Sequence, residues 1–154
     1  MSNTVITISR QYGSGGRELS EILAKKLGVK LYDRQIIHMA AAMLGIGDLT
    51  DESLRELENK VLPLSSAFMP FYSFGSHAGP NVNTELFLAE SKVIHQLVND
   101  GPCVILGRCA DYILSEQENH YSFFIYADDD YRASRGKTTY AGKSLKELNA
   151  EPYR

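Results

Sequence analysis

The chain has 154 residues, of which 44% are hydrophobic and 23% are charged, which suits a single globular domain over residues 1–154 with a core of its own. A net charge of −3 argues against binding to a nucleic acid polymer, which requires a basic face. The sequence shows no apolar span of membrane length and no leader peptide, so we expect a cytoplasmic protein that does not bind membranes.

The first predicted element is the apolar strand 5–9, which leads into a glycine-rich turn and then into a helix that ends at Gly28. A strand, a glycine-rich turn and a helix N-terminus together form a common phosphate-binding arrangement, because backbone N–H groups and the helix dipole face one concavity. The alternative is a turn that only reverses the chain. The candidate phosphate-binding residues are Tyr12, Gly13, Ser14, Gly15, Gly16 and Arg17.

The turn matches the phosphate-loop pattern G-x-x-x-x-G-K-[ST] incompletely, and two registers are open. If Gly15 is the second glycine, Arg10 stands at the first glycine, Gly16 at the lysine and Arg17 at the hydroxyl residue. If Gly16 is the second glycine, Arg17 stands at the lysine. Neither register is complete.

The helix after the turn has an apolar stripe that we expect to face the core. The stripe consists of Leu19, Ile22, Leu23 and Leu27. A short strand is predicted over residues 29–32, and Asp33 is predicted to cap a second helix that ends at Gly45. A third helix is predicted to begin at Thr50.

Residues 63–83 combine prolines and glycines with several aromatic side chains. A long connection of this kind is commonly functional, so we interpret it as a substrate-side flap. The same rings would equally suit packing on neighbouring helices or a contact between two subunits in a homo-oligomer.

A long apolar helix is predicted over residues 84–99, followed by the continuous apolar run 102–106, which is typical of a central parallel strand. Arg108 follows that strand at the end where α/β sheets bind ligands, and is therefore a candidate ligand-binding residue. The alternative role for Arg108 is a structural salt bridge. The spacing of Cys103 and Cys109 fits a buried strand residue and a reduced thiol better than a disulfide or a metal site.

The last predicted strand covers residues 121–126, and the acidic residues 128–130 after it are typical of a helix start rather than of a metal site. Arg132 and Arg135 lie three positions apart and should share one face of this helix. A capping box at Ser144 and Glu147 predicts a further helix.

Four segments together resemble the cytidylate kinase-like branch of the P-loop nucleoside monophosphate kinases. They are Ile8–Glu18, Tyr32-Asp33, Val104–Arg108 and Phe124–Ala127. The resemblance covers nearly the whole chain and implies a three-layer α/β fold with a central parallel sheet. It also implies a substrate-side insertion at about 46–83 and a lid-like basic segment at about 128–150. The family normally adds a further strand and helix, and the chain ends before them.

The resemblance favours the register that places Gly16 at the catalytic lysine and Arg17 at the hydroxyl residue. Where cytidylate kinases carry Asp-Thr-Gly, only Asp33 remains. Where they carry Asp-Gly-Arg-Asp, the chain keeps Arg108 and lacks both carboxylates. These departures argue against ordinary cytosine recognition.

The resemblance implies ATP-dependent phosphoryl transfer to a nucleotide or a related small molecule, with Mg²⁺ as the cofactor ion. The backbone of residues 12–17 would hold the donor phosphates, and Arg17 would replace the lysine charge. Arg132 and Arg135 would close over the γ-phosphate, while Arg108 and Asp33 would bind the acceptor. No metal ligand set is defined, and Asp33, Ser9 or Ser14 would help to hold the ion. The alternative function is a nucleotide-binding or regulatory module that has lost catalysis.

Overall fold

The structure is a computed structural model that describes residues 3–46 and 82–139, with side chains described for 3–46 and 84–135. Three predicted segments lie outside these residues: the helix predicted from Thr50, residues 63–81 of the aromatic segment 63–83, and the helix predicted from Ser144. Most of the predicted insertion at 46–83 and the end of the lid-like segment at 128–150 do so as well.

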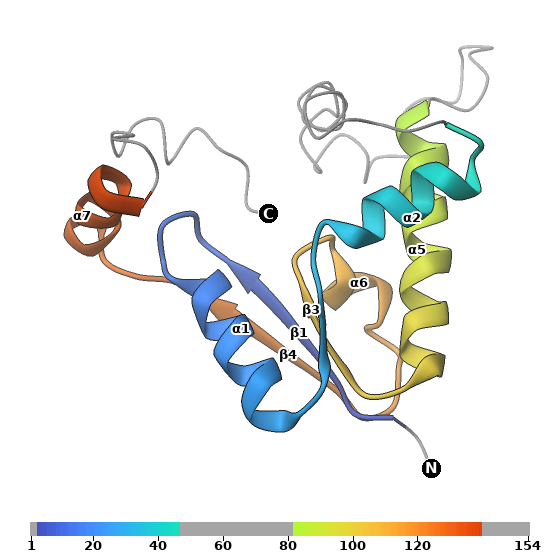
Figure 1. Cartoon of the computed structure of the whole chain (residues 1–154), viewed down its shortest axis with the longest axis horizontal. Coiled ribbons are helices and arrows are strands. Elements are labelled where there is room, and N and C mark those ends of the chain that lie inside the picture. Colours follow the sequence, from blue (N-terminus) through green and yellow to red (C-terminus); the bar gives the residue numbers. More distant parts are fainter. Residues whose placement is uncertain (1–2, 47–81, 140–154) are drawn as a thin grey trace. The chain divides into compact units, whose positions relative to one another are not determined.

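Strands and helices alternate along the described chain (Figure 1). They are β1 (Val5–Arg10), α1 (Gly16–Leu27), β2 (Lys30–Tyr32), α2 (Gln35–Met43), α5 (Val82–Asp100), β3 (Cys103–Leu106), α6 (Ala110–Ile113), β4 (His120–Ile125) and α7 (Asp129–Thr139).

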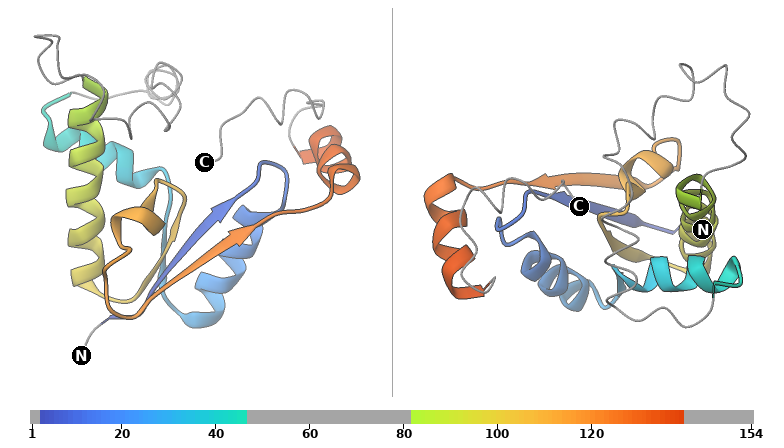
Figure 2. Two further views of the ribbon diagram at one scale, coloured as in Figure 1. Left: turned by 180° about the vertical axis from the view of Figure 1, so that it is seen from behind. Right: turned by 90° about the horizontal axis from the view of Figure 1, so that it is seen from above.

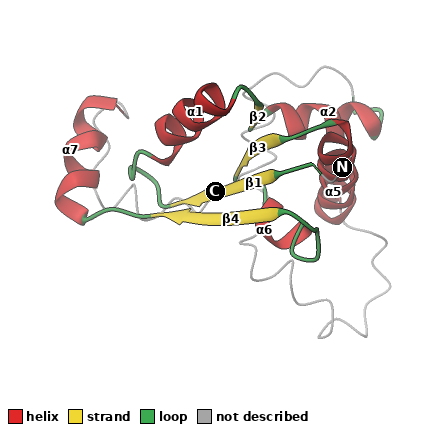
Figure 3. Ribbon diagram, turned by 90° about the horizontal axis from the view of Figure 1, so that it is seen from below, coloured by secondary structure: helices red, strands yellow, loops and turns green. Residues whose placement is uncertain are grey.

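Four parallel strands form the sheet in the order β2-β3-β1-β4. Val5 lies opposite both Cys103 of β3 and His120 of β4. Figure 3 shows α1 on one face of the sheet and α6 on the other. The predicted α/β class with a central parallel sheet is therefore confirmed. All four strands end at the same edge, where α/β sheets place their ligands.

The contacts divide the chain into two compact units. One unit, Met1–Asp33 with Ile94–Arg154, contains the whole sheet, α1, α6 and α7. Figure 2 shows β1 and β4 of this unit side by side, with the turn after β1 leading directly into α1. Every contact used below to build the site lies within this unit.

The other unit, Arg34–Val93, contains α2 and most of α5. The α2 helix buries Ile36, Ile37, Ala40 and Ala41, as its apolar pattern predicts. Its start differs from the prediction, because the N-cap residue is Arg34 rather than Asp33, and no side-chain cap is formed there. Asp33 is instead engaged by Arg17 of α1, so its carboxylate serves a contact in the first unit.

The face that α1 turns toward the sheet differs from the predicted apolar stripe. Its buried residues are Gly16, Ser20 and Ala24, at a spacing of four. These small residues let the helix approach the sheet closely, and the buried Ser20 hydroxyl donates a 2.7 Å hydrogen bond to the Gly16 carbonyl oxygen. Leu19, Ile22 and Leu27 are about half exposed, and only Leu23 of the stripe packs on the core.

The core between α1 and the sheet is built from Ile8, Ala24, Val104 and Leu106. All four residues of β3 are buried, as expected for a central parallel strand. The β4 strand is less buried, and its Tyr121, Phe123 and Phe124 are about half exposed. Among the described residues, β4 pairs only with β1, so it is an edge strand there. No helix within the described ranges is both long and apolar enough to cross a membrane.

Candidate functional site

The turn from β1 to α1 depends on glycine at two positions. Gly13 and Gly15 have φ angles of 82° and 84°, which lie in the left-handed region that glycine adopts without strain. The N–H of Gln11 donates to the Ile125 carbonyl oxygen at 2.8 Å, and the N–H of Ser14 donates to the Gln11 carbonyl oxygen at 3.1 Å. The turn is therefore tied to β4 and folded back on itself before α1 begins.

The N-terminus of α1 is suited to an anion. Gly15 is the N-cap residue, and because it has no side chain it cannot satisfy the first N–H groups of the helix. Unsatisfied N–H groups and the helix dipole both favour a negative ligand at this end. In the described part of the chain, the Ser14 hydroxyl is also buried without a hydrogen-bond partner, so the turn presents a polar atom that a ligand could satisfy.

Gly16 is packed against the end of β1. A Cβ atom on Gly16 would lie 2.6 Å from Cβ and 3.0 Å from Cγ of Arg10, and 3.4 Å from Cβ of Ile125. The first distance is shorter than any ordinary contact between carbon atoms. A larger residue at position 16, lysine included, therefore requires Arg10 to move.

Arg17 lies between two carboxylates. Its Nη2 is 3.5 Å from Oδ2 of Asp33, and its Nε is 3.4 Å from Oε1 of Glu21. The Arg17 side chain is about half exposed, whereas that of Asp33 is mostly buried. Arg17 and Asp33, both predicted site residues, are thus brought together at the end of β2.

Arg132 of α7 is buried beneath the turn, with 2% of its surface exposed. Its Nε donates a 2.7 Å hydrogen bond to the Tyr12 carbonyl oxygen, and its Nη1 donates to Oδ1 of Asp129 at 3.1 Å. The turn lies directly on this residue, because a Cβ atom on Gly13 would be 3.4 Å from both Cβ and the carbonyl oxygen of Arg132.

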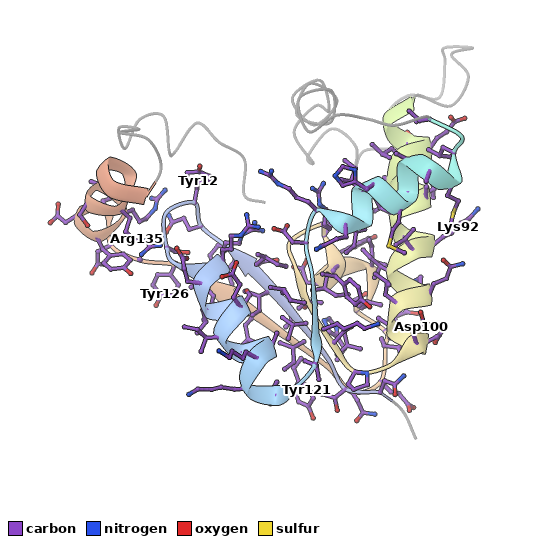
Figure 4. The ribbon with its side chains drawn as sticks, viewed as in Figure 1. Tyr12, Lys92, Asp100, Tyr121, Tyr126 and Arg135 are labelled. Carbon is purple, nitrogen blue, oxygen red and sulfur yellow. The ribbon has the colours of Figure 1, made fainter. Side chains whose placement is uncertain are left out.

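Arg135 lies one helical turn further along α7 and forms an ion pair with Glu18 of α1. Its guanidinium carbon is 5.7 Å from the centre of the Tyr131 ring. Figure 4 shows Arg135 on α7 and Tyr12 on the neighbouring turn. As predicted, Arg132 and Arg135 point to the same side of the helix, which is the side of the turn.

The turn after β3 is unusual. Gly107, Arg108 and Cys109 have φ angles of 71°, 61° and 52°, so three consecutive residues are left-handed and two of them carry side chains. A left-handed residue other than glycine costs roughly 1–2 kcal/mol, and such outliers gather at functional sites. The Gly107 N–H donates to the Ile8 carbonyl oxygen at 2.9 Å, which fixes this turn beside the end of β1.

The comparisons with known proteins decide the family. The sequence model described as the cytidylate kinase-like family matches residues 5–150. The chain belongs to this family. The resemblance found in the sequence is thereby confirmed, and membership supports a kinase-like fold. No curated protein matches the chain.

Solved structures agree with this family at the level of the fold. An uncharacterized protein from Eubacterium ventriosum is 22% identical, with a TM-score of 0.58 over 95% of this chain and 66% of that one. A gluconokinase from Sinorhizobium meliloti is 13% identical, with a TM-score of 0.53 over 96% of this chain and 72% of that one. The cytidylate kinase-like chain therefore spans just under two thirds of the first protein's length. At these identities the likeness concerns the fold alone.

Sequence reasoning missed three parts of this candidate site. Glu18 holds Arg135 across 117 positions of the chain, and the spacing of a single sequence does not pair residues so far apart. Asp129 holds Arg132, and its place three residues earlier on the same helix was a signal that could have found it. The third part is the contact between Arg10 and Gly16, for which a signal existed. In the register that the resemblance favours, Arg10 would stand at the pattern's first glycine and Gly16 at its lysine, and these two residues touch.

Among the residues that the structure describes, no three His, Cys, Asp or Glu side chains gather into a metal site. The cysteines are free thiols, as predicted. Cys103 is buried in β3, and burial raises the pKa of its thiol to about 11, so the thiol is neutral at physiological pH and is not a nucleophile.

Proposed function

We propose that this protein catalyses ATP-dependent phosphoryl transfer to a nucleotide or to another small acceptor that carries a phosphate or similar anion. The observation that carries the proposal is the β1–α1 turn. It has two left-handed glycines, a helix N-terminus that Gly15 cannot cap and a buried Ser14 hydroxyl that lacks a partner in the described chain. Family membership supports the same class of reaction.

In this proposal the turn binds the donor phosphates of ATP. The backbone N–H groups of residues 12–17 surround the phosphates, and Arg17 adds positive charge at the start of α1. A bound magnesium ion would supply positive charge to offset that of the phosphates. Asp33 and Ser14 would help to hold the ion, since Mg²⁺ usually takes one or two protein carboxylates together with the phosphates.

The two arginines of α7 have separable roles. Arg135 lies beside the turn in an ion pair with Glu18, and we assign it to the terminal phosphate, which it reaches by exchanging the Glu18 carboxylate for a phosphate oxygen. Arg132 donates to the Tyr12 carbonyl oxygen and holds the turn in the shape that receives the γ-phosphate. Phosphoryl transfer depends chiefly on such positioning and on charge stabilisation.

Arg108 is assigned to the acceptor. The left-handed turn at residues 107–109 places it after β3, at the edge of the sheet where β1 also ends. An arginine recognises a phosphate through a rigid fork of donors, so an anionic acceptor fits this position. Asp33, at the end of β2, would add a hydrogen bond to a hydroxyl or an amino group of the acceptor.

A second candidate is a nucleotide-binding or regulatory module without catalysis. The observation that favours it is the combination of glycine at position 16 and arginine at position 17, where the pattern has lysine and a hydroxyl residue. Both candidates use the turn as a nucleotide or anion site, and only the first predicts turnover.

The first experiment is calorimetric titration of the full-length protein with ATP, with and without Mg²⁺, and again with Arg17→Ala. We expect micromolar, Mg²⁺-dependent affinity that the variant loses. Lys26→Ala, which removes an exposed charge at the far end of α1, is the matched control and should bind like the unmodified protein. Absence of ATP binding would refute the kinase and leave the turn as a structural feature or as a site for another anion.

The second experiment measures transfer of labelled γ-phosphate to nucleoside monophosphates, beginning with CMP, and to small phosphorylated or hydroxylated metabolites. For a productive acceptor, Arg108→Ala should raise the acceptor KM at least tenfold while leaving ATP affinity unchanged. ATP binding without transfer to any acceptor would favour the non-catalytic module.

A further inference from the structure

Residues 10 and 16 have exchanged the residue types that the phosphate-loop pattern assigns to them. In the register supported by the family, the pattern has glycine at the end of the strand and lysine at the start of the helix. This chain has Arg10 at the strand end and Gly16 at the helix start. One cation and one residue without a side chain are present in both arrangements.

The two positions are in contact, so the residue at one position limits which side chain the other can carry. A Cβ atom on Gly16 would lie 2.6 Å from Arg10 Cβ and 3.0 Å from Arg10 Cγ. The first two carbons of the Arg10 side chain therefore occupy the space from which a lysine side chain at position 16 would start. Either position can carry a long side chain, but the two cannot do so together in this backbone.

Strand geometry explains why Arg10 reaches this space. Side chains alternate across a strand, so Arg10 is on the same face as Ile8, and Ile8 packs against Ala24 of α1. The β4 residue opposite Arg10 is Ile125, whose Cβ lies 3.4 Å from the same hypothetical atom. Arg10 thus leaves β1 on the α1 side of the sheet, directly beside the helix N-terminus.

We propose that Arg10 supplies, from the strand side of the turn, the phosphate-binding cation that lysine at position 16 supplies in the usual pattern. This inference rests on the proposed ATP site and names the residue that replaces its lysine. Arg10 is charged at every relevant pH and has donors arranged in a fork that fits phosphate oxygens. Arg17, which contacts Asp33 and Glu21, would add a second positive charge at the start of α1.

The test compares four variants with the unmodified protein in titrations with Mg-ATP and with inorganic tripolyphosphate, which reports on the phosphates without the base. Arg10→Gln keeps most of the aliphatic part of the side chain and removes the charge. It should weaken the affinity for both ligands roughly 10- to 100-fold, the loss expected for one charged hydrogen-bond donor. The double variant Arg10→Gly with Gly16→Lys restores the usual pattern and should recover most of the affinity that Arg10→Gly alone loses. Lys26→Gln is the control for loss of one positive charge.

Unfolding in urea separates binding from packing. Gly16→Ala should lower the free energy of unfolding, although alanine is the better helix former. The loss should be smaller in the Arg10→Gly background, because the contact between the two side chains is gone. If Arg10 had only a structural role, the stabilities would be coupled in this way, but the Arg10→Gln variant would bind ATP with normal affinity.

Each outcome bears on the proposal. Weak binding by Arg10→Gln together with recovery in the double variant supports it. Unchanged affinity of a folded Arg10→Gln protein overturns this inference alone and leaves the ATP site in place. A double variant that is as stable as Arg10→Gly but binds no better also overturns it. If the unmodified protein binds neither ligand, the inference and the proposed function fail together.

Discussion

Arg132 Nε lies 2.7 Å from the Tyr12 carbonyl oxygen and donates a hydrogen bond to it. The two residues are 120 positions apart, and this bond fastens α7 to the glycine-rich turn. Gly13 rests on the backbone of the same arginine. The shape of the candidate phosphate site therefore depends on the helix that follows β4 as well as on β1 and α1.

Replacing Arg132 with methionine should destabilise the protein. Methionine fills a similar volume but removes both donors, leaving the Tyr12 carbonyl oxygen without this bond and Asp129 without its partner. Loss of a buried hydrogen bond from a charged group costs about 1.5–3 kcal/mol, and the free energy of unfolding in urea measures it. ATP affinity should fall as well, because the turn loses its support.

The control for this variant is Asp130→Asn on the exposed side of the same helix, which should change the free energy of unfolding by less than about 0.5 kcal/mol. A Met variant as stable as the unmodified protein would show that the hydrogen bond from Arg132 does not hold the turn.

Replacing Glu18 with glutamine should strengthen ATP binding. The Glu18 carboxylate holds Arg135 and places a negative charge near the phosphate site. One of its oxygens is also buried with no hydrogen-bond partner in the described chain. The amide releases Arg135 and removes the repulsion, so we expect ATP to bind about threefold to tenfold more tightly, a change of roughly 1 kcal/mol.

Calorimetry at two salt concentrations checks this prediction, since the gain should shrink as salt screens the charges. Glu116→Gln serves as the control, because it removes one exposed acidic residue between α6 and β4 without touching Arg135 or Arg17. Equal gains from both variants would mean that net charge, rather than release of Arg135, causes the effect.

The fold could be predicted because its signals are local. The apolar run at Val104 and its neighbours indicated a buried central strand, and glycines marked the end of α1. The buried face of α1 could not be predicted from hydrophobicity. The helix approaches the sheet through Gly16, Ser20 and Ala24, where small size matters more than apolar character.

The candidate site was only partly predictable. The turn with Gly13 and Gly15 was visible as a phosphate-binding pattern, and Arg132 and Arg135 were assigned to one helix face. Their partners were not predictable, since Tyr12 and Glu18 lie more than a hundred residues earlier in the chain. The left-handed turn at Arg108 also escaped prediction, because neither it nor Cys109 favours that conformation.

Replacing Cys109 with glycine should stabilise the protein. Cys109 has a φ angle of 52°, which costs a residue with a side chain roughly 1–2 kcal/mol and costs glycine nothing. The greater freedom of glycine in the unfolded chain offsets about 0.4–1 kcal/mol of the gain. We expect a net increase of about 0.5–1 kcal/mol in the free energy of unfolding, measured in urea.

Glu118→Gly is the comparison for this variant, since Glu118 has no positive φ angle and the substitution should destabilise. Asn119→Gly should fall between the two, because asparagine tolerates its φ of 56° better than cysteine does. If Cys109→Gly behaved like Glu118→Gly, the turn after β3 would not be strained.

The buried thiol of Cys103 should make stability fall at alkaline pH. Burial raises its pKa from 9.0 to about 11, so the folded chain keeps this proton over a range in which the unfolded chain has lost it. The stabilising contribution is complete below pH 9 and is lost as the pH rises from about 9 to about 11, with a slope of at most roughly 1.4 kcal/mol per pH unit. Urea unfolding across this range, compared between Cys103→Ala and the unmodified protein, isolates the slope from that of the other titrating groups. Cys109→Ala, which removes the less buried thiol, should leave most of the slope in place, and an unchanged slope in Cys103→Ala would refute the assignment.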